Sequence, residues 1–161
     1  MKWAVPLVAA AVVVFAGCGG DGGSPLTKAE FIKRGDAICT KYRKKNRELN
    51  EKAPAKNPTD PSATDEQVKA SAPILETLAT NLRSARDEFA ALEPPADVKI
   101  DWQNTLDDLE QISSKLDDAA AAARDLDRQR VVNEYAEILR LNRRVSTFEA
   151  DYGFTVCGTS A

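Results

Sequence analysis

The chain has 161 residues, 22 basic and 25 acidic side chains, no histidine and a formal charge of −3. Without histidine it cannot form a Ser-His-Asp triad, a Cys-His pair, or the histidine-containing helix motifs that bind zinc or a di-iron centre. Its length fits a single domain, and its net negative charge argues against nucleic-acid binding.

The first residues have the pattern of a lipoprotein signal peptide. Lys2 supplies the positive start, residues 4–15 are apolar apart from one proline, and the small pair Ala16-Gly17 precedes Cys18. Signal peptidases cleave after small residues that follow such a segment. The sequence therefore predicts a signal peptide over residues 1–17, with Cys18 as the first residue of the mature protein.

The alternative for this segment is a retained membrane span, which needs about 20 apolar residues. The run is shorter, contains Pro6 and ends in glycines. We therefore predict that Cys18 is lipidated and anchors the protein to the outer face of the cell membrane. Residues 18–26 are interpreted as a flexible glycine-rich tether, and residues 27–161 as the folded helical domain.

A first helix is predicted from Lys28 to about Lys52. Thr27 and Glu30 have the spacing of a capping box, in which each side chain accepts a hydrogen bond from the other residue's backbone N–H. Apolar side chains and one glycine then recur at the spacing of one helix face, at Phe31, Gly35, Ile38, Tyr42 and Leu49. A loop with three prolines follows.

A second helix is predicted over residues 65–93, where Thr64 and Gln67 form another candidate capping box. Proline is tolerated only in the first turn of a helix. Pro73 therefore indicates either a kink in this helix or a later start, with Ser71 as the N-cap.

Two further amphipathic helices are predicted over residues 97–124 and 128–152. Asp97 is the expected N-cap of the first of them, and Asp125 or Asp127 that of the second. Gly153 is the expected left-handed cap at the end. The fold class is therefore all-α, an up-down-up-down four-helix bundle, because four helices of similar length are joined by mostly short connections.

In such a bundle the last helix is antiparallel to the first and adjacent to it, so the chain ends near the start of the first helix. Gly35 either leaves a groove there for Phe154 or Val156, or is simply a tolerated glycine. Cys39 and Cys157 are predicted to form a disulfide, because an exported protein meets an oxidising environment. The alternative is two free, buried thiols.

Segments around both cysteines resemble the small uncharacterised exported lipoproteins of high-GC Gram-positive bacteria. The resemblance lies in Ala29-Glu30-Phe31-Ile32, Asp36-Ala37-Ile38-Cys39 and Tyr152-Gly153-Phe154 before Cys157. It implies an exported helical domain with paired terminal cysteines, and it implies no activity.

Charge is unevenly distributed along the chain. Residues 28–52 carry nine basic and four acidic side chains, a net charge of +5, whereas residues 97–124 carry three basic and seven acidic ones, −4. One interpretation is solvated helix faces that pair with their neighbours. The other is contact with an anionic envelope surface. The candidate contact residues are Lys41, Arg43, Lys44, Lys45 and Arg47.

These observations predict a cell-envelope lipoprotein that acts as a binding or scaffolding module. Its expected partners are the membrane, through the lipid anchor, and an anionic envelope polymer or another envelope protein. We predict no catalytic residues, cofactor or metal. Two alternatives remain: a carrier of a small apolar ligand between the helices, and a carboxylate-dependent enzyme.

Overall fold

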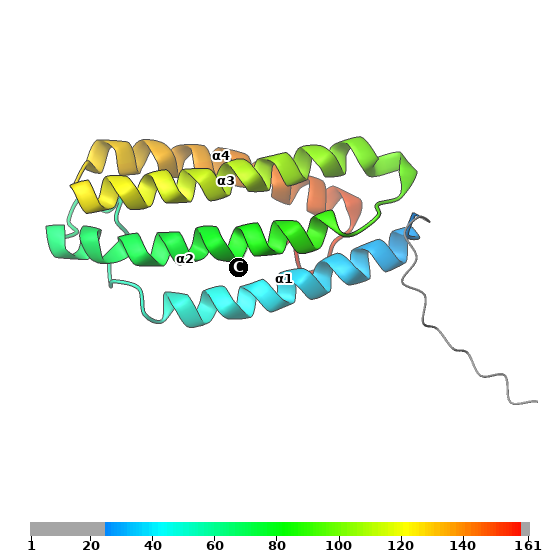
Figure 1. The fold of residues 1–161 in the computed structure, drawn as a ribbon, viewed down its shortest axis with the longest axis horizontal. Coiled ribbons are helices and arrows are strands. Elements are labelled where there is room, and N and C mark those ends of the chain that lie inside the picture. The colour runs from blue at the N-terminus through cyan, green and yellow to red at the C-terminus, as the bar shows by residue number, and fades with distance from the viewer. Residues whose placement is uncertain (1–24, 159–161) are drawn as a thin grey trace, which may run out of the picture.

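The computed structural model describes residues 25–158, which form four long α-helices and one short 3-10 helix. The elements are α1 (Lys28–Asn50), α2 (Asp65–Ala90), η1 (Ala96–Val98), α3 (Lys99–Asp125) and α4 (Arg128–Tyr152). The helices run alternately along one long axis (Figure 1). The prediction of an all-helical, up-down-up-down bundle is confirmed. The predicted signal peptide, the lipidation site Cys18 and most of the tether lie outside the described residues.

The helix starts follow the predicted capping chemistry in three of the four cases. Thr27 and Thr64 each form a complete capping box, with Glu30 and Gln67 respectively. Of the two candidates before α4, Asp127 is the N-cap, because its carboxylate accepts the Arg130 N–H at 3.0 Å. Gly153 ends α4 in the left-handed region, at φ 103°, as predicted.

Two local expectations about α2 and α3 need correction. α2 begins at Asp65 and continues through Pro73, so the later start is wrong; the Ser71 hydroxyl donates to the Val68 carbonyl instead of capping a helix. The predicted cap at Asp97 is also wrong. After the double proline, Val98 N–H bonds back to Pro95 in a tight 3-10 turn, so Asp97 lies inside that turn and α3 starts without a side-chain cap.

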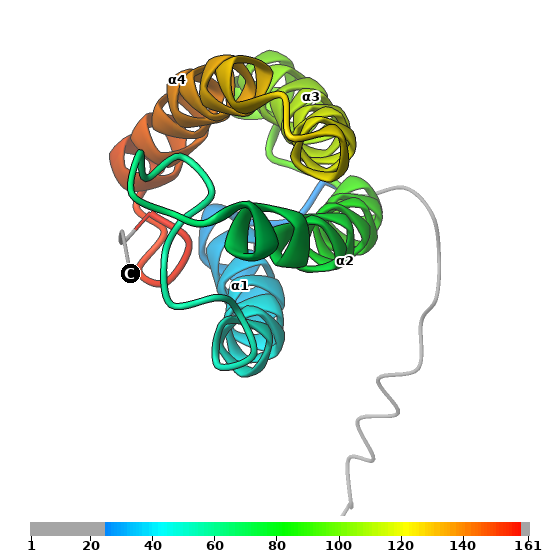
Figure 2. The same cartoon turned by 90° about the vertical axis from the view of Figure 1, so that its left-hand side faces the viewer.

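The arrangement of α1 differs from the expected bundle. α2 packs along α3 and α3 along α4, whereas α1 packs chiefly on α2, and no Cα atom of α1 lies within 8 Å of one in α4. Figure 2 shows the reason, because the loop before α2 and the C-terminal tail (residues 153–158) pass between α4 and α1. The expectation that the first and last helices, α1 and α4, are direct neighbours is therefore wrong.

The core has two parts along the bundle. One end is aromatic, where Phe31 from α1 meets Trp102 and Tyr152 with ring centroids 4.9 and 5.9 Å apart. The other end contains many small side chains, including Ala119, Ala120, Ala122 and Ala123 of α3, which let α2 and α4 pack closely on α3. Only three residues of α1 are buried, Phe31, Gly35 and Tyr42, so this helix lies at the outside of the fold.

Within residues 25–158, no helix combines the length and the apolar character needed to cross a membrane.

Candidate functional site

The five predicted surface-contact residues do not share one side of α1. Lys41 faces α2, where its ammonium lies 2.6 Å from a Glu88 carboxylate oxygen that also accepts the Tyr42 hydroxyl at 2.7 Å. The ammonium of Lys45 lies 4.7 Å from the centre of the Tyr42 ring. These contacts direct two of the five cations toward α2.

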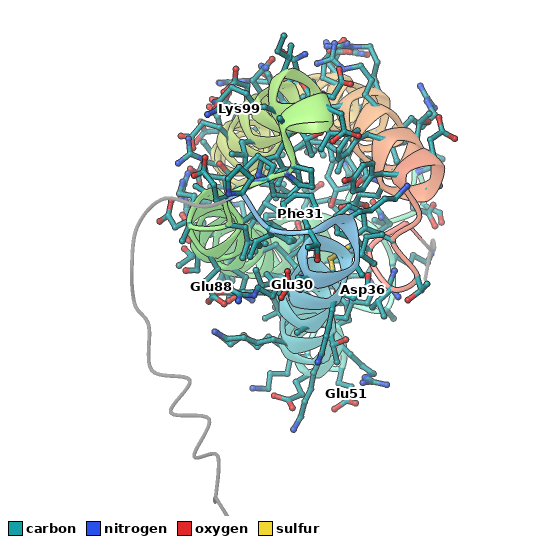
Figure 3. The ribbon with its side chains drawn as sticks, turned by 90° about the vertical axis from the view of Figure 1, so that its right-hand side faces the viewer. Glu30, Phe31, Asp36, Glu51, Glu88 and Lys99 are labelled. Atoms are coloured by element: carbon teal, nitrogen blue, oxygen red, sulfur yellow. A yellow bond between two sulfur atoms is a disulfide. The ribbon has the colours of Figure 1, made fainter. Side chains whose placement is uncertain are left out.

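The hydrogen bond to Glu88 raises the pKa of Lys41, and the same bond lowers the pKa of Glu88. Both side chains are therefore charged at every physiological pH. Arg43 lies toward another side of α1, where its charge acts on Glu149 of α4. Figure 3 shows Glu88 on α2 and Asp36 on the side of α1 that faces the tail.

Lys44 and Arg47 remain on the outer surface of α1. Both are exposed, as is Lys33 three turns before Lys44, and within residues 25–158 none of the three has a carboxylate within ion-pair distance. At 100° per residue these positions fall on one side of the helix. We call Lys33, Lys44 and Arg47 the outer cations of α1; Glu48 and Glu51 lie beside them at the C-terminal end.

Cations on the other helices are mostly paired across helix interfaces. Arg83 and Arg124 join α2 and α3 through Asp117 and Glu76. Arg144 of α4 donates from Nε and from one terminal nitrogen, Nη2, to the two carboxylate oxygens of Asp108 on α3, and Asp108 is 6% exposed. The interpretation of α3 as a helix whose charges pair with its neighbours accounts for these contacts.

An open groove of about 1000 Å³ runs between α3 and α4. Its walls carry opposite charges, with Asp101 and Asp107 on α3 and Arg140 and Arg143 on α4. Tyr152 lines one end; it is 7% exposed, and its hydroxyl has no hydrogen-bond partner among the described residues. Because both charge signs are present, the groove favours no single class of charged ligand.

Adjacent acidic residues on α3 do not form catalytic pairs. Asp107 accepts from Gln103, whereas its neighbour Asp108 points to Arg144. Asp117 faces Arg83 and Asp118 faces Arg130. Each carboxylate thus has a separate partner, as expected for neighbours on a helical surface.

The predicted disulfide between Cys39 and Cys157 is present, with the two Cα atoms 5.3 Å apart. It joins the middle of α1 to the C-terminal tail. Phe154 of the tail fills the space beside Gly35, where any added Cβ would overlap its ring and meet two further ring atoms at 3.3 Å. Of the two alternatives for Gly35, the structure shows the groove, with Phe154 as its occupant.

Asp36 fixes the path of the same tail. Its carboxylate accepts the backbone N–H groups of Thr155, Val156 and Cys157 at 2.9 to 3.1 Å, and the Thr155 hydroxyl at 2.6 Å. Partial burial alone would raise the pKa of Asp36, but these hydrogen bonds to the charged form lower it. Asp36 therefore holds the tail in place as a carboxylate.

Glu149 is a buried carboxyl beside the disulfide that the sequence reasoning missed. It is 8% exposed, and a carboxylate oxygen and the two sulfur atoms all lie within 4.8 Å of one another. Its position, one turn before the end of α4 and eight residues before Cys157, was the only available signal. The three side chains are of types that bind metals, but oxidised sulfurs do not offer the thiolates that a metal requires.

Comparisons of the chain with protein-family models, with curated proteins and with solved structures gave no match.

Proposed function

We propose that the protein is a membrane-anchored binding module of the cell envelope and that α1 contacts a phosphate-rich anionic surface. The observation that carries this proposal is the contrast between helices. Most cations of α2, α3 and α4 face carboxylates, whereas the outer cations of α1 have no such partner among the described residues.

The order of segments along the chain supports the same reading. The predicted anchor at Cys18 and its glycine-rich tether lead directly into α1, which lies at the outside of the bundle (Figure 1). A short tether keeps this helix at high effective concentration near the bilayer. Each basic residue close to an anionic membrane contributes about 1 kcal/mol.

A carrier of a small apolar ligand is the second candidate. The observation in its favour is a pocket of about 220 Å³ between the proline-rich loop, α2 and Tyr135 of α4. Ligand sites usually occupy about 300 to 1,000 Å³. The rings of the aromatic core lie directly against one another, with centroids 4.9 to 6.4 Å apart. Surface binding by α1 is therefore the better supported function.

The proposal is tested by vesicle binding without the lipid anchor. The mature chain, residues 18–161 with Cys18→Ser, is mixed with phosphatidylglycerol or phosphatidylcholine vesicles, and bound protein is measured by sedimentation. We expect binding to the anionic vesicles only, weakened by added salt because ions screen surface charges.

The matched variants separate α1 from net charge. Replacing Lys33, Lys44 and Arg47 with glutamate should lower binding more than about 100-fold, since at least about 3 kcal/mol is lost. The control replaces Lys69, Lys99 and Arg143, exposed cations of the other helices, and has the same net charge. Equal losses in the two triple variants, or equal binding to both vesicle types, would contradict the proposal.

Polyphosphate serves as a second probe that carries the same chemistry without a bilayer. Binding to polyphosphate with the same dependence on the outer cations would assign the surface to an envelope polymer as well as to lipid. Binding to anionic vesicles alone would assign it to the membrane.

A further inference from the structure

The disulfide has an acidic group placed beside it. The Glu149 carboxylate and the sulfur atoms of Cys39 and Cys157 lie within 4.8 Å of one another, and both cysteines are only partly buried. A disulfide that only crosslinks the chain needs no carboxyl next to it. Glu149 is 8% exposed, and burial of a carboxyl disfavours its charged form.

Burial and two charged groups determine the protonation of Glu149. Burial raises its pKa to about 7, the positive charge of Arg43 on α1 opposes that rise, and the negative charge of Asp36 on α1 adds to it. A carboxyl with such a pKa donates and accepts protons near neutral pH. The distance to the sulfurs is short enough for transfer after a small side-chain rotation or through one water molecule.

We propose that Cys39, Cys157 and Glu149 form a thiol–disulfide exchange centre, which accepts electrons from a dithiol and in which Glu149 supplies the proton. One thiolate of the dithiol attacks the Cys39 sulfur and forms a mixed disulfide. The bond between the two cysteine sulfurs breaks, and its electron pair leaves on the Cys157 sulfur. The Glu149 carboxylic acid protonates that thiolate and becomes a carboxylate, which later takes a proton from water.

The second thiol of the dithiol then completes the exchange. This second thiol loses its proton to solvent and then attacks the sulfur of the mixed disulfide that belongs to the dithiol itself. The Cys39 thiolate is released and takes a proton from water. The dithiol is oxidised to a disulfide and gives two electrons, and the cystine is reduced to two thiols.

The structure favours Cys157 as the leaving sulfur. Its Sγ atom lies 3.4 Å from the Gly35 carbonyl oxygen, which can accept the S–H hydrogen once Cys157 is protonated. Cys39 stays within α1, whereas Cys157 belongs to the tail. Reduction therefore removes the covalent link between α1 and the tail, while Asp36 and Phe154 keep their non-covalent contacts.

The test uses the full chain with Cys18→Ser, so that Cys39 and Cys157 are the only cysteines. Its reduction by dithiothreitol is followed by thiol labelling and mass spectrometry at pH values below and above 7. The observed rate constant is divided by the concentration of the thiolate form of dithiothreitol, which removes the pH dependence of the reagent itself. We expect it to fall at least about tenfold as pH rises and Glu149 loses its proton.

Glu149→Gln should lose this pH dependence and react more slowly than the parent at low pH. Glu137→Gln, an exposed carboxylate of the same helix paired with Arg140 at 2.8 Å, is the control and should keep the parental profile. Parallel profiles for Glu149→Gln and the parent, with one constant ratio at all pH values, would overturn the proposal. If circular dichroism shows that Glu149→Gln is misfolded, Glu149→Leu is used for the same comparison.

Discussion

Removing the disulfide gives the most quantitative test of how the C-terminal tail holds α1. The perturbation is the double substitution of Cys39 and Cys157 by serine in the Cys18→Ser chain. The two cysteines are 118 residues apart in sequence. Closing a loop of that length stabilises a protein by about 5 kcal/mol in the chain-entropy model, because the link restricts the unfolded chain.

This amount is large beside the total stability of a domain, which is about 5 to 15 kcal/mol. The contacts of Asp36 and Phe154 with the tail and with α1 remain in the variant. We therefore expect a folded helical protein of much lower stability, with native helix content at low temperature. Its slope of unfolding free energy against urea should rise modestly, since the unfolded chain becomes more expanded.

Urea unfolding followed by far-ultraviolet circular dichroism measures the effect. The oxidised parent is the reference, and the parent with the disulfide reduced in denaturant gives the same covalent change without mutation. A loss of several kcal/mol in both comparisons is the expected result. A loss below about 1 kcal/mol would refute the reasoning, because loop closure would then contribute little to folding.

Three further predictions concern single residues around the tail. Gly35→Ala should lower the free energy of unfolding, measured in urea, by about 1 kcal/mol. Overlap of the new methyl group with Phe154 costs about 1 to 3 kcal/mol, and the better helix propensity of alanine returns about 1 kcal/mol. Adding Phe154→Leu should recover the loss, and additive costs of the two substitutions would contradict direct contact. Asp36→Ala should cost about 2 kcal/mol and speed hydrogen exchange at the Val156 amide, because a charged acceptor is lost; unchanged exchange would exclude the contact. The folded-state pKa of Glu149 is raised from 4.5 to about 7, so the native state binds the proton more tightly and stability should fall by up to about 3 kcal/mol as pH rises between these values. Glu149→Gln should flatten this slope in unfolding titrations, and a parental slope in that variant would place its origin elsewhere.

The fold could be predicted from the sequence where a local rule governs it. The capping boxes at Thr27 and Thr64 fix two helix starts through contacts three residues apart, and these contacts form as expected. Cys39 and Cys157 could be paired because only two cysteines follow the predicted lipidation site. Asp97 failed as a cap because the preceding prolines impose a tight turn that propensity alone does not reveal.

The arrangement of the candidate sites depended on tertiary packing and could not be predicted. The basic residues of α1 were recognisable by composition, but their division among α2, the surroundings of Glu149 and solvent depends on where α1 lies in the fold. The expected contact of α1 with α4 failed because the proline-rich loop and the tail lie between them (Figure 2). Glu149 was inconspicuous in sequence, since its burial and its proximity to the disulfide arise only when the tail turns back at Gly153.

The most direct test of the account is the intact mass of the protein isolated from membranes, measured with and without a reducing agent. We expect a chain that begins at Cys18 and carries the added mass of acyl chains, and that gains two hydrogens on reduction of the bond between Cys39 and Cys157. A full-length chain in the soluble fraction with three free thiols would contradict it.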